Sequence, residues 1–153
     1  MDLSKKHFET TLNSIIINKT KLEKKQTLFP FSQHVGFKLV ERTPSKSHFR
    51  LVIQDFHFNP QKVVHGGVLY SLADTGMGAA LYPMLNLEKG ELCATIEIKM
   101  TYLKAARKGM LDCYTTVIHK GKRVAMLESE VWNEGKLIAK ATGSYAVFTP
   151  GKS

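Results

Sequence analysis

The second half of the chain alternates apolar and polar residues, the pattern of β-strands that bury one face. Residues 96, 98, 100 and 102 are apolar, and the residues between them are polar or charged. Three further apolar runs follow, separated only by the short polar segments 120–122 and 134–135. The pattern predicts strands over 95–102, 110–119, 123–133 and 136–148, with the last three joined as consecutive hairpins.

The first half of the chain combines two shorter strands with one long helix. Apolar runs over 36–42 and 48–53 flank the turn-forming segment 43–46, so each run is predicted to form a strand. After a loop over 55–64, residues 66–82 are apolar on nearly every face. Their length and their alanine and leucine content favour a helix, and a helix that is apolar all round is expected to be buried.

A further helix is predicted near the N-terminus, over 4–19, because its apolar residues fall on one helical face. The order of elements indicates an α+β fold in which one antiparallel sheet wraps around a long central helix. The 153 residues fit a single domain with one core. We expect residues 1–30 to form the N-terminal helix and a linker, and residues 31–150 to form the core.

Composition excludes few partners. The chain has 22 lysines and arginines against 13 acidic residues, a net charge of +9 that suits nucleic acid, a membrane surface or a phosphorylated small ligand. No basic stripe interleaved with aromatic residues is present, so we do not expect a nucleic-acid partner. No secretory signal or membrane span is recognisable, which predicts a cytoplasmic protein without membrane insertion. Cys93 and Cys113 lack a ligand-like spacing and are expected to be small buried residues.

Asp74 is the most informative residue, because it is the only charged side chain between residues 66 and 82. A lone carboxylate on a buried helix costs several kcal/mol unless it is paired or has a task. No lysine or arginine lies three or four positions away to pair with it. An apolar setting also raises the basicity of a carboxylate, so Asp74 is a candidate general base or nucleophile.

The segment His65-Gly66-Gly67 lies where this helix is predicted to begin. The first turn of a helix presents unpaired N–H groups, and glycines let a ligand approach that backbone closely. Such a site can hold a carbonyl oxygen and stabilise an oxyanion. For His65 itself, a structural or orienting role fits its position better than direct catalysis.

The spacing of these two features predicts a dimer. Asp74 lies eight residues after Gly66, which is about 12 Å along one helix. A base and an oxyanion donor must both reach the same reacting centre, so one helix cannot supply both parts to one substrate. We therefore predict an obligate dimer in which the helix start of one subunit faces Asp74 of the other.

Neither a nucleophilic triad nor a metal-ligand or cofactor motif is recognisable, so no metal and no cofactor are expected.

The run Asn59 to Gly78 resembles the signature of the PaaI-type acyl-CoA thioesterases of the hotdog-fold superfamily. That signature contains an asparagine, then His-Gly-Gly, then an acidic residue seven positions after the second glycine. Similarity continues through the segments 95–103, 120–126 and 135–142, and it spans about residues 33 to 149.

The resemblance implies that the protein hydrolyses an acyl-CoA thioester, with Asp74 as base or nucleophile and the Gly66 N–H polarising the carbonyl. It implies that Asn59 holds the water or carbonyl region, that His65 supports the turn, and that the Thr95 hydroxyl helps to place the water. It also implies a homodimer, often doubled to a tetramer.

Further substrate contacts are expected around this centre. Gly67 belongs to the same helix start, and Tyr70 and Met77 are candidates to line the acyl tunnel. The chain departs from the family at 104–106, where a proline is common. Lys104 and Arg107 in that region are candidates to contact CoA phosphates.

Three other functions remain open at this stage. A non-catalytic acyl-CoA sensor would share the fold, although residues 1–30 are too short for a helix-turn-helix. A hotdog dehydratase or hydratase would need a histidine paired with an acid across the site, whereas His65 adjoins Gly-Gly. A basic nucleic-acid binder is the third alternative. The acyl group, and the choice between water attack and an anhydride intermediate, are left undecided.

Overall fold

The structure, a computed structural model, describes residues 30–151. Residues 35–151 belong to one compact unit, which carries all the strands described below. The short helix α2 (Pro30–Val35) ends at the first residue of this unit, and every other described element lies within it. The predicted helix over 4–19 falls outside the described residues, so its place in the domain stays a prediction.

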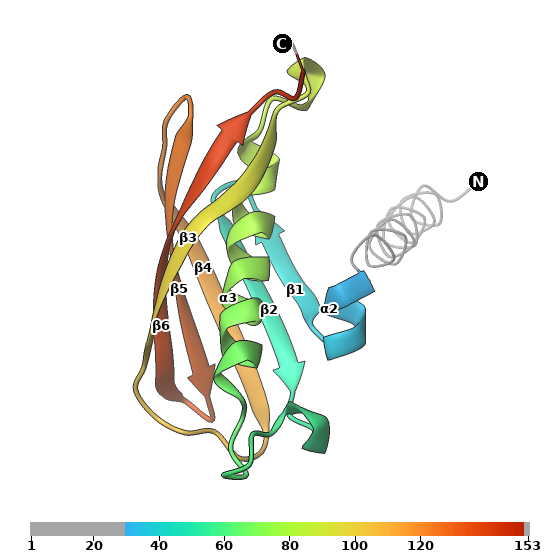
Figure 1. Ribbon diagram of the computed structural model, residues 1–153, viewed down its shortest axis with the longest axis vertical. Helices are drawn as coiled ribbons and strands as arrows, with labels where there is room; N and C mark the ends of the chain where they lie inside the picture. Colours follow the sequence, from blue (N-terminus) through green and yellow to red (C-terminus); the bar gives the residue numbers. More distant parts are fainter. Residues whose placement is uncertain (1–29, 152–153) are drawn as a thin grey trace, which may run out of the picture. The chain divides into compact units, whose positions relative to one another are not determined.

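The unit contains one long helix, α3 (Gly66–Leu81), and six strands (Figure 1). The strands are β1 (Lys38–Thr43), β2 (Lys46–Val52), β3 (Leu92–Tyr102), β4 (Met110–Lys120), β5 (Val124–Asn133) and β6 (Lys136–Phe148). Short 3-10 turns at Asp55–His57, Tyr82–Met84 and Leu87–Lys89 flank α3. All six predicted strands and the long helix are confirmed, and β3 begins three residues earlier than its alternation suggested.

The strands form a single antiparallel sheet in the order β1-β2-β4-β5-β6-β3. The predicted meander of the last three strands is confirmed. β3 leaves sequence order and pairs with β6, which makes β3 the edge strand opposite β1. α3 crosses one face of this sheet, as predicted for an α+β hotdog fold (Figure 1).

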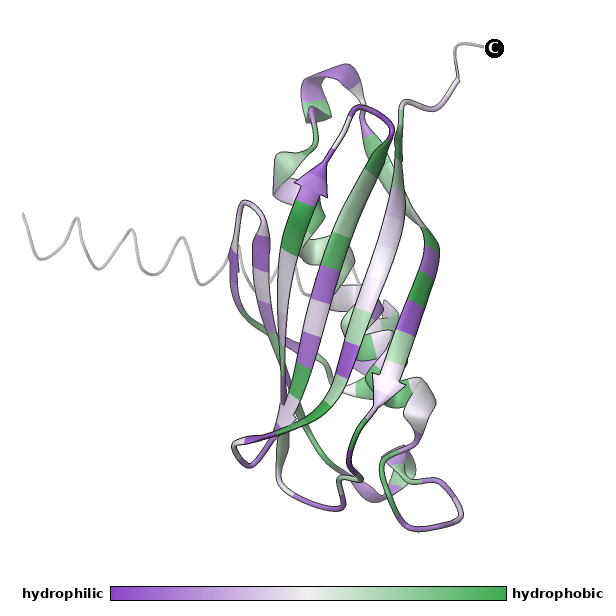
Figure 2. Ribbon diagram, turned by 90° about the vertical axis from the view of Figure 1, so that its left-hand side faces the viewer, coloured by the Kyte–Doolittle hydropathy of each residue, from purple (hydrophilic) through white to green (hydrophobic). Residues whose placement is uncertain are grey.

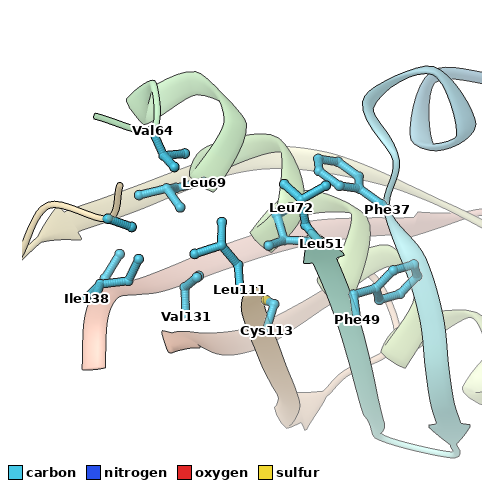
Figure 3. Close-up of a cluster of buried hydrophobic side chains, with 12 residues drawn as sticks. Phe37, Phe49, Leu51, Val64, Leu69, Leu72, Leu111, Cys113, Val131 and Ile138 are labelled. Carbon is cyan, nitrogen blue, oxygen red and sulfur yellow. The ribbon is translucent and has the colours of Figure 1, made fainter. Parts of the chain in front are cut away.

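Apolar residues on the helix-facing side of the sheet form the core together with one face of α3. Figure 3 shows Leu69 and Leu72 of α3 directed toward side chains from β2 and β4, among them Leu51 and Leu111. A second cluster lies toward the C-terminal half of α3, where Met77 is fully buried. On the strands, hydrophilic and hydrophobic bands alternate along the chain (Figure 2), which is the period-two pattern from which they were predicted.

The expectation that α3 is buried on every side needs a correction. Its sheet-facing residues are buried, but Gly67 and Tyr70 are exposed, and Asp74 and Gly78 are partly exposed. These four residues recur at helical spacing and mark one accessible face. A helix on a single-layer sheet has only one covered side, so its other side stays open within this chain.

Glycine allows α3 to approach the sheet closely. A Cβ at Gly76 would lie 2.6 Å from the Thr115 hydroxyl oxygen on β4. Nearby, the Ser47 hydroxyl donates a hydrogen bond of 2.8 Å to the Gly76 carbonyl oxygen, and the hydroxyl groups of Thr115 and Ser129 lie 2.7 Å apart. The hydroxyl groups between helix and sheet are therefore hydrogen-bonded, as buried polar groups must be. Within residues 30–151, no helix is long and apolar enough to cross a membrane.

This contact yields a stability prediction. Gly76→Ala places a methyl group against a hydroxyl that Ser129 holds in place, so we expect the free energy of unfolding to fall by about 1–3 kcal/mol. Gly78→Ala is the matched control, because nothing lies within 4 Å of its Cβ position and alanine favours a helix by up to about 1 kcal/mol. Urea unfolding of both variants measures the difference. Equal stabilities would contradict the close packing of α3.

Candidate active site

The loop before α3 is held by backbone and side-chain hydrogen bonds. The buried ring of His57 accepts a bond from the Gln54 N–H at Nδ1 and donates from Nε2 to the Val35 carbonyl oxygen, at 3.0 and 2.8 Å. The His57 carbonyl oxygen in turn accepts from the His65 N–H at 2.8 Å. His57 therefore fixes where α3 begins.

Asn59 stabilises the tight turn inside this loop. Its side-chain oxygen accepts bonds from the N–H groups of Gln61 and Val63, at 3.0 and 3.3 Å. The Asn59 N–H also donates to the Val63 carbonyl oxygen at 2.8 Å. No residue of the described chain accepts from the Asn59 amide nitrogen, so this group keeps its donors for another partner.

His65 is the N-cap of α3. Its Nδ1 accepts a bond of 2.9 Å from the Gly67 N–H, and its carbonyl oxygen accepts from the Val68 N–H at 2.9 Å. The Gly66 N–H has no acceptor among the described residues. Capping by His65 thus leaves one first-turn donor, at Gly66, available for a ligand.

Tyr102, at the end of β3, covers the other side of Gly66. Its hydroxyl donates to the Gly66 carbonyl oxygen at 3.1 Å, and a Cβ at Gly66 would lie 3.2 Å from the tyrosine ring. Partial burial and the neighbouring Tyr70 raise the pKa of Tyr102, so its hydroxyl stays protonated and able to donate. Tyr102 therefore packs against Gly66 and holds its carbonyl oxygen.

The Asp74 carboxylate lies further along the same accessible face of α3. The Thr95 hydroxyl on β3 donates a bond of 2.7 Å to Asp74 Oδ1. The Tyr145 hydroxyl on β6 lies 2.5 Å from the same Oδ1 and 3.0 Å from the Asp74 carbonyl oxygen. The expectation of an isolated, buried carboxylate is thus corrected, because Asp74 is partly exposed and one of its oxygens is held by two hydroxyl groups.

The sheet register brings these hydroxyl groups together. Thr95 on β3 and Tyr145 on β6 are direct cross-strand partners, so their side chains leave the sheet on the same face. The register of β3 shifts immediately afterwards, between Thr95 and Glu97. Tyr145 is 2% exposed, whereas Thr95 is exposed at the edge of the sheet. The cluster is therefore rigid on its β6 side and open on its β3 side.

A basic depression lies beside the start of α3. It has a volume of about 270 Å³ and is lined by Lys104, Ala105, Arg107, Lys108, Asn133, Glu134, Lys136 and Ile138. The Val64 N–H donates to the Ala106 carbonyl oxygen at 2.9 Å, which ties this loop to the segment that leads into α3. Four cationic side chains against one carboxylate make the depression suitable for an anion.

The structure brings six of the residues predicted for the site together in two groups, whereas Asn59 lies in the preceding loop and Lys104 and Arg107 line the basic depression. His65, Gly66, Gly67 and Tyr70 lie at the start of α3, and Asp74 and Thr95 lie together further along it. Met77 is fully buried in the core beneath α3, where its sulfur would meet a Cβ at Gly143 at 2.8 Å. The expectation that Met77 lines an acyl tunnel is therefore corrected, because the sheet covers its side chain and leaves no surface for a substrate.

Sequence reasoning missed Tyr145 and Tyr102 as site residues. Tyr145 carried one usable signal. It occupies an inward-facing position of a predicted strand, where a buried tyrosine needs a hydrogen-bond partner for its hydroxyl. The position of Tyr102 over Gly66 could not be read from the sequence, because it depends on how β3 crosses α3.

Comparison with known proteins identifies the family. The family model described as the thioesterase superfamily matches residues 61–140, which contain the start of α3, Asp74 and Thr95. The chain belongs to the thioesterase superfamily. The resemblance to hotdog-fold thioesterases and the predicted class of thioester hydrolase are thereby confirmed.

Two curated members illustrate the relationship. Acyl-coenzyme A thioesterase 13 of Pongo abelii is 30% identical over 105 residues, covering 67% of this chain and 73% of the relative. The medium/long-chain acyl-CoA thioesterase YigI of Escherichia coli is 29% identical over 99 residues, covering 57% of this chain and 64% of the relative.

Solved structures of the superfamily have the same fold. A mutant of the phenylacetic acid degradation protein PaaI from Thermus thermophilus has a TM-score of 0.68 at 25% identity, covering 76% of this chain and 97% of that one. A thioesterase from Haemophilus influenzae has a TM-score of 0.75 at 23% identity, covering 84% and 90%.

Proposed function

We propose that this member of the superfamily hydrolyses an acyl-CoA thioester to a free acid and CoA, with Asp74 as the catalytic carboxylate. The observation that carries the proposal is the pair of half-sites on α3. One offers a free N–H at Gly66, and the other offers a carboxylate held at Oδ1 and open to solvent.

In the proposed reaction, the Gly66 N–H donates a hydrogen bond to the thioester carbonyl oxygen and stabilises the negative charge that develops there. Asp74 takes a proton from water while the water oxygen bonds to the carbonyl carbon. The carbon–sulfur bond then breaks, and the CoA thiolate takes the proton back. In the alternative route, Asp74 attacks the carbonyl carbon, releases CoA and leaves an anhydride that water hydrolyses.

Asn59, His65 and Thr95 have supporting roles in this proposal. His65 uses Nδ1 to occupy the Gly67 N–H, so that Gly66 alone presents a free donor. Asn59 has an unused amide nitrogen close to the same turn, which can hold water or the carbonyl region. The Thr95 hydroxyl is exposed beside Asp74 and can assist the attacking water.

The functional unit in this proposal is a homodimer, because Gly66 and Asp74 are about 12 Å apart on one helix. β3 supports the proposal, since it is an 11-residue edge strand with no buried residue, and Leu92, Ile96 and Tyr102 are 44%, 57% and 53% exposed. A long exposed edge strand is a template for pairing with another chain.

Antiparallel pairing of two β3 edges would complete both sites. Thr95 marks the Asp74 end of β3, and Tyr102 marks the Gly66 end. In a two-fold interface, if one residue of the first subunit faces a second residue of the partner, then the second residue of the first subunit also faces the first residue of the partner. A two-fold axis midway between Thr95 and Tyr102 would therefore set the Asp74 cluster of one subunit against the Gly66 turn of the other. We also propose that two such dimers can associate into a tetramer.

The basic depression is the proposed site for CoA phosphates. Lys104 and Arg107 lie on the loop that hydrogen-bonds to the segment before α3, and Lys108 and Lys136 add to the same surface. Tyr70, which is 37% exposed on the accessible face of α3, is proposed to face the acyl group. The named relatives include a medium/long-chain acyl-CoA thioesterase and a phenylacetic acid degradation protein, so both linear and aryl acyl groups are candidates. A cytoplasmic location is also proposed.

The first test measures thiol release from aryl-, short-, medium- and long-chain acyl-CoAs. We expect Asp74→Asn to lower kcat by roughly 10²–10⁴-fold, because an amide cannot accept a proton or attack. The thermal unfolding temperature of the variant serves as the folding control. Release that is undiminished in Asp74→Asn would refute the assignment, and binding of acyl-CoA without release by the wild type would indicate a sensor.

The Gly66 N–H can be tested with two variants at one position. Gly66→Pro removes the N–H at the first helical position, where proline is tolerated, and the extended His65 backbone (ψ 134°) suits a following proline. Gly66→Ala keeps the N–H and introduces the same Cβ beside Tyr102. We expect kcat to fall by roughly 10²–10³-fold in the proline variant and much less in the alanine variant. Equal losses would assign the effect to the tyrosine contact instead.

The composite site predicts complementation between defective subunits. A heterodimer of Asp74→Asn with Gly66→Pro, purified through two different tags, would contain one site with both defects and one intact site. Its activity should be about half that of the wild-type dimer, although each homodimer retains only about 1% or less. If one chain supplied both groups, every subunit of the heterodimer would be defective and the activity would stay at background.

A further inference from the structure

Tyr145 is a buried polar group that the reaction above does not use. It is 2% exposed, lies on β6, and its hydroxyl reaches Asp74 Oδ1 at 2.5 Å. The Asp74 carbonyl oxygen is 3.0 Å away, so the single hydroxyl proton has its closer acceptor in the carboxylate. The tyrosine is too deeply buried beneath Asp74 to be a surface contact of the substrate.

Tyr145 and Thr95 act on the same atom. Both donate to Oδ1, and no residue of the described chain bonds to Oδ2. No buried side-chain oxygen or nitrogen in the described part lacks a partner. Oδ2 has no partner and is therefore not buried, which means that it opens to solvent on the accessible face of α3.

Tyr145 remains a donor throughout the range in which an aspartate is ionised. Burial, reinforced by the adjacent Asp74 carboxylate, raises the pKa of Tyr145 well above that of a free phenol. Its ring is locked between two paired strands, since Tyr145 is opposite Thr95 on β3 and Ala125 on β5. The Tyr145 side chain is already ordered in the folded protein, so holding the Asp74 oxygen costs no further side-chain entropy when substrate binds.

We propose that Tyr145 is a positioning residue of the thioesterase: with Thr95 it fixes Oδ1 of Asp74, so that Oδ2 is the oxygen that acts on the water or the thioester carbon. The inference rests on the proposed function of Asp74. It adds which oxygen reacts and which buried group sets its direction. A reacting oxygen misplaced by 1 Å costs about 10²-fold in rate, so a fixed carboxylate has a direct kinetic effect.

The test is Tyr145→Phe, which removes only the hydroxyl and keeps the ring. We expect kcat to fall by roughly 10- to 100-fold while KM changes little, because the carboxylate loses its orientation and not its substrate. Tyr114→Phe is the matched control. Tyr114 lies on the other face of the sheet, stacked on His48 at a centroid distance of 4.3 Å, and its change should leave both constants unaltered.

Two further measurements separate positioning from a general loss of structure. The thermal unfolding temperature shows whether Tyr145→Phe is folded at the assay temperature, and KM shows whether it still binds substrate. A lower kcat in a folded variant with unchanged KM is the result expected of a carboxylate that has lost its orientation.

Thr95 provides a conservative rescue on the same oxygen. Thr95→Val should lower kcat in the same sense as Tyr145→Phe, and Thr95→Ser, which keeps the hydroxyl, should recover most of the rate. Wild-type kcat in Tyr145→Phe, or a reduced rate that comes from a raised KM or from unfolding of the variant, would overturn the inference. If Asp74→Asn is inactive in either case, the proposed function stands and only the role of Tyr145 fails; an active Asp74→Asn refutes the proposed function itself.

Discussion

The arrangement depends on the close approach of α3 to a single sheet. Gly76 leaves no room for a Cβ against Thr115, and a Cβ at Gly143 would meet Met77. Small residues at these points let helix and sheet pack closely, and the hydroxyl groups between them are hydrogen-bonded. The depth at which α3 lies then decides which side chains of β3 and β6 can reach its accessible face.

That accessible face carries both halves of the proposed site because one helix serves two purposes. Its sheet-facing residues bury apolar surface and stabilise the fold, while its N-terminus and Asp74 remain open. His65 caps the helix and still leaves one donor free, because its Nδ1 accepts from the Gly67 N–H and not from the Gly66 N–H. The two oxygens of the Asp74 carboxylate differ in the same sense, because two hydroxyl groups hold Oδ1 while Oδ2 stays open.

The position of β3 links the site to assembly. β3 supplies Thr95 to one half-site and Tyr102 to the other, and it forms the exposed edge of the sheet. An unpaired edge of eleven residues without a buried side chain is not a stable end point for a sheet. The same strand therefore carries the residues that complete the proposed reaction and the surface that the proposed dimer would cover.

By itself, the sequence determined the six strands and the long helix, and it singled out Asp74 and His65-Gly66-Gly67 as candidates for the site. Periodicity and a lone charge can be recognised from neighbouring residues alone. Only the tertiary structure decided that β3 pairs with β6, that Tyr145 meets Asp74 and that Tyr102 covers Gly66. Those contacts join segments far apart in the chain, and they depend on strand register and on the depth of helix packing. Neither quantity leaves a local pattern in the sequence, so the residues that hold the carboxylate could be found only in three dimensions.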